Sequence, residues 1–435
     1  MTATIYLMLA TAMFFLQDTY FSLGGVDFSL KNPCILAILF LALLNFTATV
    51  RLDRTFLLAR HVVVQALPFF IPFFFSAVIW VIGRADAVTV ANGTGMILPQ
   101  LLSVCVAAAT LYLFGSRGMW YCLGAMCAAN LLRVLVVVVV GGPSVFFQEF
   151  LRLLATFSAE TGDLMIQLEI NDLTFAFGPF LIYLLLNRKE TRHWLFWMLS
   201  VSLFFFIGLK RIAVPAVALG VLVALLVRRL PEKAAAQTAL GIAAGMMVVS
   251  FFYIVGIRMG LFQYLQQRLG INTMGRVEMF NHLEPYYDIS ITYLGRGTGF
   301  ERFVDWASGV VYDTPRRTIM QIHNDFLRMY LNIGFIGYWV WLWGTLVVRL
   351  RYWFSEGRKE AGSLFLGISI YCFVLYATDN TIYYPYTLLA CAIVPMAYHM
   401  DEMAEKGFTR RCEEWSGNTG QKEKDENGFQ ETGRG

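Results

Sequence analysis

The chain has 435 residues, of which 57% are hydrophobic and 15% charged, and its mean hydropathy is +0.59. This composition lies far outside the range of soluble globular proteins. The net charge of +4 carries little information by itself, because the positions of the charges matter more. All seven cysteines lie in apolar stretches or in the C-terminal tail, which argues against a disulfide framework or a cysteine-based zinc site. We expect no nucleic-acid partner and no cofactor.

Apolar segments long enough to cross the hydrocarbon core of a bilayer recur along the chain. The expected fold class is therefore an all-α polytopic membrane protein with about 12 transmembrane helices. The predicted spans are 2–17, 33–50, 61–82, 95–115, 119–140, 173–187, 194–209, 212–227, 234–256, 323–348, 363–382 and 385–400. The first begins without a basic region or cleavage site and is interpreted as a retained span rather than a signal peptide.

Four regions follow from this pattern. Helices 1–9 occupy residues 1–256, a long polar loop occupies 257–322, and helices 10–12 occupy 323–400. Residues 401–435 are charged and rich in glycine and asparagine, which is typical of a disordered tail.

Lysines and arginines in the short intervals predict the orientation. The richer set of intervals contains Arg51, Arg54, Arg60, Arg117, Arg188, Lys189, Arg192, Arg228, Arg229, Lys233, Arg349, Arg351, Arg358, Lys359, Lys406, Arg410 and Arg411. The alternate short intervals contain only Lys31, Arg84, Arg152, Lys210 and Arg211. Both termini are then cytoplasmic, and the long loop is external.

Two features before the long loop are open to more than one interpretation. Ser144–Ser158 has an apolar face, which indicates an amphipathic helix that lies in the outer interface or packs on the bundle. Arg133 lies inside the fifth span, where a charge costs about 2.5–3.5 kcal/mol unless it is paired. Asp379 lies near the outer end of the eleventh span and could meet it, as a structural pair or in contact with substrate.

The long loop concentrates arginine. Between residues 257 and 328 there is no lysine, and the loop arginines are Arg258, Arg268, Arg276, Arg296, Arg302, Arg316 and Arg317. A guanidinium grips phosphate bidentately, whereas an ammonium acts as a point charge. The segment therefore indicates an external site for a phosphate-bearing lipid. For five of these arginines a solvated or ion-paired position is the favoured interpretation, namely Arg258, Arg268, Arg302, Arg316 and Arg317. Its carboxylates Glu278, Glu284 and Asp288 match no standard metal-binding loop, so no metal is predicted.

His323 opens the tenth span at the outer boundary, where it could accept a proton from a sugar hydroxyl or orient one. The alternative is an interfacial histidine without a chemical role. Asn324 supplies a helix-capping oxygen, and the glycines at 334 and 337 predict the close approach of a neighbouring helix.

These motifs resemble the O-antigen polymerase and O-antigen ligase superfamily. The resemblance covers roughly residues 195–385, while the first five spans match only as generic membrane helices. It is carried by His323-Asn324-x-x-Leu327 with Gly334-x-x-Gly337, by Leu209-Lys210-Arg211, by Gly275-Arg276-Val277-Glu278-Met279-Phe280, and by Leu294-Gly295-Arg296-Gly297-Thr298-Gly299-Phe300. Lys210, where many relatives have serine, and Asp325 depart from the family pattern and leave polymerase versus ligase open.

The resemblance implies a GT-C-like membrane glycosyltransferase of the bacterial cytoplasmic (inner) membrane. Its substrate would be a polyprenyl-pyrophosphate-linked oligosaccharide, and its partners would be membrane lipid and the chain-length regulator and flippase of the same pathway. Arg211 and Arg276 would contact pyrophosphate, and His323 would contact the acceptor hydroxyl. The residues expected to bind substrate around them are Arg296, Arg328, Asn324 and Lys210. A flippase or transporter is the alternative from another class.

Overall fold

The computed structural model describes residues 1–435 except 18, 24–25, 84, 86, 157–172, 190, 209, 271–275, 301–321, 357–358 and 405–435. The described part is almost wholly helical, with one antiparallel hairpin of β1 (Tyr20–Leu23) and β2 (Val26–Ser29). The α-helices are α1 (Thr2–Phe15), α2 (Lys31–Ala48), α3 (Leu52–Gly83), α4 (Ala87–Phe114), α5 (Arg117–Gly141), α6 (Pro143–Thr156), α8 (Leu173–Leu186), α9 (Trp194–Ile207), α10 (Ala213–Arg228), α11 (Glu232–Arg258), α12 (Leu261–Leu269), α13 (Arg276–Leu283), α15 (Asp325–Leu342), α16 (Arg349–Glu356), α17 (Lys359–Thr378) and a last helix over 385–404. Short elements are η2 (Glu284–Tyr286), the π-helix η3 (Trp343–Val348) and η4 (Thr381–Tyr383).

The prediction of an all-α membrane protein is confirmed at this level. In the described chain, seven helices are long and apolar enough to cross a membrane. They are Lys31–Ala48, Leu52–Gly83, Thr89–Phe114, Arg117–Gly141, Glu232–Arg258, Asp325–Glu356 and Lys359–Thr378. Four shorter apolar helices and the helix over 385–404 coincide with the remaining predicted ranges. The number of crossings, the GT-C-like architecture and the placement of the long loop outside stay predictions.

Two boundaries differ from the sequence prediction. The third helix begins at Leu52, well before the predicted residue 61, and it continues through Pro68 and Pro72 to Gly83. The tenth span was expected to end at 348, with Arg349 in a loop. Instead the helix continues through a π-helical stretch to Glu356, and Arg349 is half-buried in the bundle.

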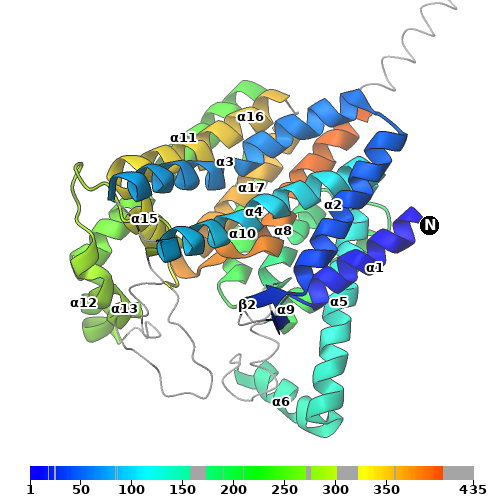
Figure 1. Ribbon diagram of the computed structural model, residues 1–435, viewed down its shortest axis with the longest axis horizontal. Helices are drawn as coiled ribbons and strands as arrows, with labels where there is room; N and C mark the ends of the chain where they lie inside the picture. The colour runs from blue at the N-terminus through cyan, green and yellow to red at the C-terminus, as the bar shows by residue number, and fades with distance from the viewer. Residues whose placement is uncertain are drawn as a thin grey trace, which may run out of the picture.

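Helix α17 lies at the centre of the bundle, and most of its length is buried (Figure 1). It packs closely on α10, because Gly220 and Gly367 face one another there. A Cβ atom added to Gly220 would lie 2.5 Å from the Gly367 carbonyl oxygen. The C-terminal end of α17 is the point at which the candidate site is assembled.

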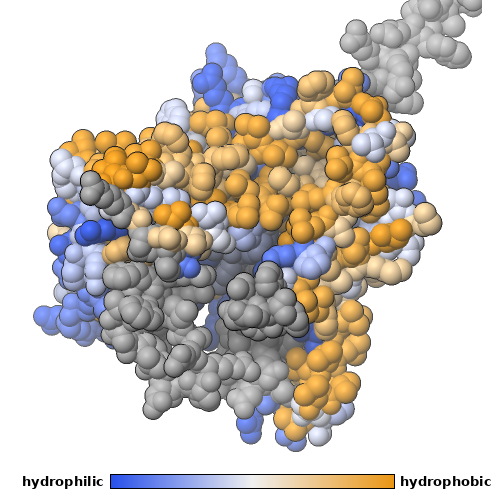
Figure 2. All heavy atoms as spheres, viewed as in Figure 1, coloured by the Kyte–Doolittle hydropathy of each residue, from blue (hydrophilic) through white to orange (hydrophobic). Residues whose placement is uncertain are grey.

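The outer surface of the bundle is apolar. Hydrophobic residues cover most of its visible face, and the larger hydrophilic groups lie toward its ends (Figure 2). Phe56 is 67% exposed, Phe74 65% and Leu199 62%, which would be unfavourable in water but suits contact with lipid tails. Helices α12 and α13 lie at the end of the bundle away from the N-terminus (Figure 1).

Helix α6 occupies the range predicted to be amphipathic and projects from the end of α5 (Figure 1). Phe146 and Phe150 stack on one another with ring centroids 6.1 Å apart and pack near Val137 of α5. Phe147 and Leu151 are 60% and 50% exposed. One apolar edge therefore packs on α5 while another is left uncovered in the described structure, and its location in the interface stays a prediction.

Candidate functional site

The first turn of α15 fixes the position of His323. Asn324 is fully buried, and its Oδ1 accepts a hydrogen bond of 2.8 Å from the Leu327 amide, which caps the helix. Its Nδ2 donates to the Tyr253 hydroxyl at 3.0 Å and to the Ala377 carbonyl at 3.1 Å. One side chain thus joins the start of α15 to α11 and to the end of α17. Asn324 therefore stabilises the packing of these three helices, and the substrate contact predicted for it stays a prediction.

His323 and Asp379 form the central pair of the site. His323 Nδ1 lies 3.3 Å from Asp379 Oδ1, with the imidazole 51% exposed and the carboxylate 13% exposed. A carboxylate can only accept, so Nδ1 carries the proton and Nε2 of a neutral ring is left as an acceptor. Burial raises the pKa of Asp379, but the hydrogen bond to His323 and the charge of Lys210 outweigh it, so the pKa is lowered and the carboxylate stays ionised. The pair can accept a proton from a hydroxyl group.

Lys210 and Tyr384 lie beside this pair. The Tyr384 hydroxyl lies 3.3 Å from Asp379 Oδ1 and 2.5 Å from Asn380 Oδ1. Its ring stacks on Phe175 of α8 at 5.9 Å, and Lys210 Nζ lies 5.7 Å from the centre of the same Phe175 ring. A cation on the turn before α10 thereby faces the carboxylate on the segment after α17.

Arg276, the first residue of α13, reaches the same helix end. Its Nη2 donates to the carbonyl of Thr378 at 2.6 Å, one residue before Asp379. Its guanidinium also interacts electrostatically with the Tyr253 hydroxyl. The predicted residues Arg276, His323 and Lys210 therefore converge at the C-terminus of α17.

No family model, curated protein or solved structure matches this chain. The resemblance to the polymerase and ligase superfamily therefore rests on the motifs alone.

Arg211 does not share the interaction of its neighbour Lys210 with Asp379. It follows Lys210 on the turn before α10 and is exposed. It forms no hydrogen bond or ion pair with the described residues, so its proposed pyrophosphate contact has no geometric support beyond this position.

Arg328 and Arg296 lie outside the converging group. Arg328 is 2% exposed; its Nη2 donates to the Ile322 carbonyl at 2.9 Å and its Nη1 lies 3.8 Å from Asp325 Oδ1. Arg296 is exposed, and its Nε donates to the Tyr286 carbonyl at 3.1 Å. Arg328 is thus part of the buried packing at the start of α15, while Arg296 contacts the segment that follows α13.

The glycine segment (Tyr293–Gly299) is hydrogen-bonded to the backbone of α15. Its backbone inserts at a break in α15, where Gly334 adopts φ 70° and ψ −172°. The Arg296 amide donates to the Leu331 carbonyl at 2.9 Å, the Gly297 amide donates to the Asn332 carbonyl at 2.7 Å, and the Phe335 amide donates to the Tyr293 carbonyl at 2.9 Å. Backbone groups freed by the break are therefore satisfied by the loop.

The prediction that a helix approaches at both glycines of α15 is half correct. At Gly334 the approaching chain is the glycine segment: a Cβ there would lie 2.3 Å from the Tyr293 carbonyl oxygen. At Gly337 it is Phe75 of α3, 3.0 Å away. The two glycines predict that another part of the chain approaches closely. They do not predict whether that part is a helix or a loop.

Sequence reasoning also missed the partners of His323. Asp379 was considered as a partner for Arg133, whereas the structure hydrogen-bonds it to His323 and Tyr384. Arg133 Nη2 instead donates to the Phe15 carbonyl at the end of α1, at 3.3 Å. The available signal was the polar run from Thr378 to Tyr384 directly after an apolar span.

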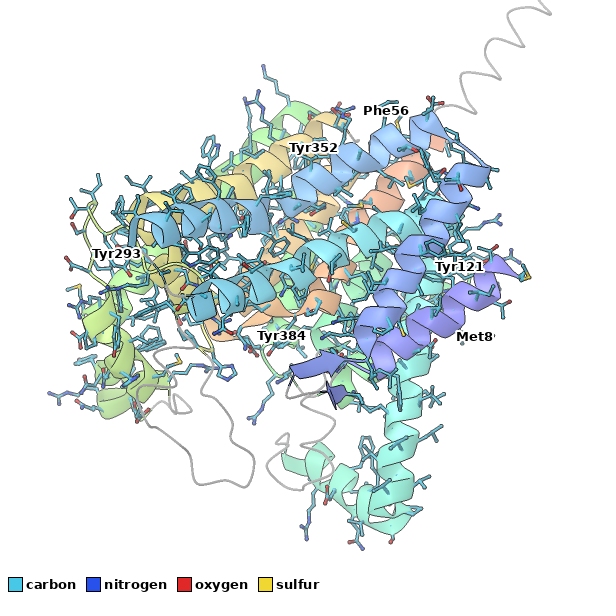
Figure 3. The ribbon with its side chains drawn as sticks, in the orientation of Figure 1. Met8, Phe56, Tyr121, Tyr293, Tyr352 and Tyr384 are labelled. Atoms are coloured by element: carbon cyan, nitrogen blue, oxygen red, sulfur yellow. The ribbon has the colours of Figure 1, made fainter. Side chains whose placement is uncertain are left out.

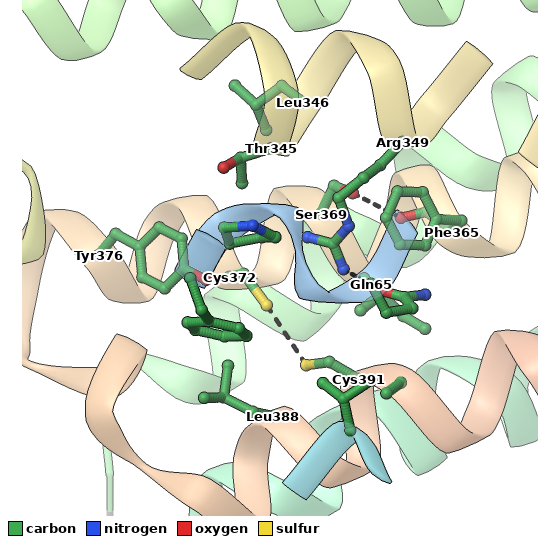
Figure 4. Close-up of a pocket in the computed structure, with 15 residues that line it drawn as sticks. Gln65, Thr345, Leu346, Arg349, Phe365, Ser369, Cys372, Tyr376, Leu388 and Cys391 are labelled. Carbon is green, nitrogen blue, oxygen red and sulfur yellow. Dashed lines mark hydrogen bonds between the residues drawn. The ribbon is translucent and has the colours of Figure 1, made fainter. Parts of the chain in front are cut away.

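Two other polar clusters differ from the site in being enclosed. His61 and His399 face one another with 3.3 Å between ring nitrogens, and both are at most 1% exposed. A small cavity of about 30 Å³ is separately lined by Arg349, which binds Gln65, and by the thiols of Cys372 and Cys391, 3.4 Å apart (Figure 4). Neither presents a reactive group to a large substrate.

No group of three histidine, cysteine, aspartate or glutamate residues that could hold a metal occurs among the residues described. Of the loop carboxylates considered above, Glu284 is ion-paired with Arg258 at 2.5 Å.

Proposed function

We propose that this protein polymerises lipid-linked oligosaccharide repeat units into a surface polysaccharide, such as an O-antigen, capsule or exopolysaccharide, on the outer face of the cytoplasmic membrane. The observation that carries the proposal is the His323–Asp379 hydrogen bond at a helix end where Lys210 and Arg276 also arrive. A proton acceptor beside two cations suits glycosyl transfer from a diphosphate.

The proposed reaction is a displacement at the anomeric carbon. A hydroxyl of the incoming lipid-linked repeat gives its proton to His323 Nε2, and its oxygen forms a bond to the anomeric carbon of the growing chain. The bond from that carbon to the polyprenyl pyrophosphate breaks, and the diphosphate leaves with the electron pair. Asp379 stabilises the imidazolium that forms.

The leaving diphosphate needs cationic contacts. Arg276 and Lys210 are proposed to supply them, with Arg211 at the same turn as a third. Preorganised donors of this type contribute about 3–4 kcal/mol each to lowering a barrier. Arginine is favoured over lysine for bidentate contact, so Arg211→Lys should impair activity although the charge is kept.

A ligase is the second candidate, because the same donor chemistry serves a different acceptor. It would transfer the finished glycan to a lipid core or another acceptor. The lipid-linked species that accumulates in a deletion strain separates the two: single repeat units indicate a polymerase, and long unattached chains indicate a ligase.

The site is tested with paired variants. We expect His323→Ala and Arg276→Ala to abolish long-chain product at normal protein level, since general base catalysis alone contributes about 10²–10⁴-fold. His282→Ala and Arg268→Ala change an exposed histidine on α13 and an exposed arginine on α12, and should leave product unchanged. Near-normal product from His323→Ala would refute the proposal. A flippase would instead need Arg133 and Asp379 while tolerating loss of His323.

A further inference from the structure

An apolar groove runs along the side of the bundle between α1 and α5. Its volume is about 500 Å³, and it is lined by Leu7, Met8, Thr11, Ala12, Phe15, Leu16 and Leu132. It is open along its length, and Met8 on α1 is 64% exposed (Figure 3). A groove of this size takes part of a single extended hydrocarbon chain.

Arg133 supplies a positive charge at one end of the groove. Its guanidinium donates to the carbonyl of Phe15, which together with Leu16 and Leu132 forms that end. The contact sets the cation at the C-terminus of α1, where the helix dipole favours it. A charge in an otherwise apolar span is a candidate functional group, since it is costly to insert. Here the guanidinium lies beside Phe15, the last residue of α1.

The same turn of α1 connects the groove to the candidate site. On its other face, Phe14 packs edge-on against Tyr386 with ring centroids 4.9 Å apart. The Tyr386 hydroxyl donates to the Met13 carbonyl at 2.7 Å. Tyr386 lies two residues after Tyr384, which hydrogen-bonds to Asp379. The end of α1 therefore contacts Arg133 on one side and Tyr386, two residues from Tyr384 of the site, on the other.

We propose that the groove binds the polyprenyl chain of a lipid whose phosphate is held by Arg133. The charge at the end of the groove matches an anionic headgroup, and the uncharged lining matches an isoprenoid tail. The inference rests on the proposed function, because the occupant would be the lipid carrier of the donor or of the released diphosphate. Phosphate and tail are recognised at separate places, so each can be tested alone.

The test is a binding titration followed by native mass spectrometry of the purified full-length protein. The probes are a polyprenyl monophosphate, the corresponding polyprenyl alcohol, and phosphatidylglycerol. We expect Arg133→Gln to weaken the polyprenyl phosphate about tenfold or more, because a charged hydrogen bond is lost, and to leave the alcohol unchanged. Ala12→Trp fills the groove and should weaken both.

Matched controls are available on the same helices. Arg117→Gln removes an exposed arginine at the other end of α5, and Ile5→Trp enlarges an exposed residue of α1 outside the groove; neither should change binding. If Ala12→Trp does not fold, Met8→Trp replaces it, because Met8 lines the groove and is exposed. This variant should likewise weaken binding of both the polyprenyl phosphate and the alcohol.

Three results would overturn the proposal: binding unchanged in Arg133→Gln and in the folded groove variant, equal loss in the controls, or equally tight phosphatidylglycerol binding that both variants abolish. The last would make the occupant a structural phospholipid. Binding is measured without turnover, so normal product from His323→Ala would refute the proposed function and leave the groove intact.

Discussion

Replacement of Gly334 by alanine tests the break in α15. Gly334 has φ 70° and ψ −172°, a backbone region almost restricted to glycine that costs a residue with a Cβ atom about 1–3 kcal/mol. The added Cβ would lie 2.3 Å from the Tyr293 carbonyl oxygen and from the Leu294 carbonyl carbon, so the glycine segment must move. Three backbone hydrogen bonds then weaken or break, at about 1 kcal/mol each. Together these effects amount to about 4–6 kcal/mol of unfolding free energy.

The assay is thermal unfolding of the purified protein in detergent. We expect the midpoint for Gly334→Ala to fall by at least about 5 °C. Gly245→Ala is the control: Gly245 lies inside α11, a Cβ there meets nothing within 4 Å, and alanine should stabilise the helix by about 0.5–1 kcal/mol. If Gly334→Ala and Gly245→Ala unfold at the same temperature, α15 runs unbroken past residue 334 and the reasoning fails.

Three further variants probe the same end of the bundle. Asn324→Ala removes the cap of α15 and two interhelical hydrogen bonds, so the unfolding free energy measured with denaturant should fall by about 2–3 kcal/mol; a loss below about 0.5 kcal/mol would contradict the contacts described. Arg328→Met leaves Asp325 buried without its cation and should cost about 3–5 kcal/mol, and most of this should be recovered when Asp325→Asn is added; no recovery would mean that the two side chains are not coupled. Asp379 has a lowered pKa in the folded protein, so it contributes stability above its unfolded pKa of about 3.9 and loses it as the pH falls through the folded value. The difference in thermal midpoint between wild type and Asp379→Asn should therefore persist at pH 5 and shrink below about pH 4, and a difference that persists at lower pH would exclude this carboxylate as its source.

Helix positions could be predicted because each depends on local composition. The apolar runs that end near Gly141 and Arg258 are visible in the sequence, and the helices end there. The extension of the tenth span to Glu356 could not be predicted, because Arg349 is stabilised by contacts with Gln65 and the Phe365 ring, which come from two other helices. A charged residue marks a helix end only when no such partners exist.

The candidate site was predictable in part for the same reason. His323 is predicted from its position at the outer boundary of a span and from its motif, and Arg276 from the motif that begins at Gly275. The pairing of His323 with Asp379 joins residues 56 apart in the chain, and it depends on the packing of α15 against α17. Arg328 is expected from the resemblance to bind substrate, yet it is buried beside Asp325.

The insertion of the glycine segment into α15 limits how this protein can be recombined with others. A chimaera that exchanges the polar loop alone would separate Tyr293 and Arg296 from the helix turn at 331–335 whose carbonyl and amide groups they satisfy. The exchangeable unit is therefore not the stretch between two membrane helices. A graft that preserves folding must carry residues 293–299 and the first half of α15 together, so evolution or an engineer altering specificity has to change both at once.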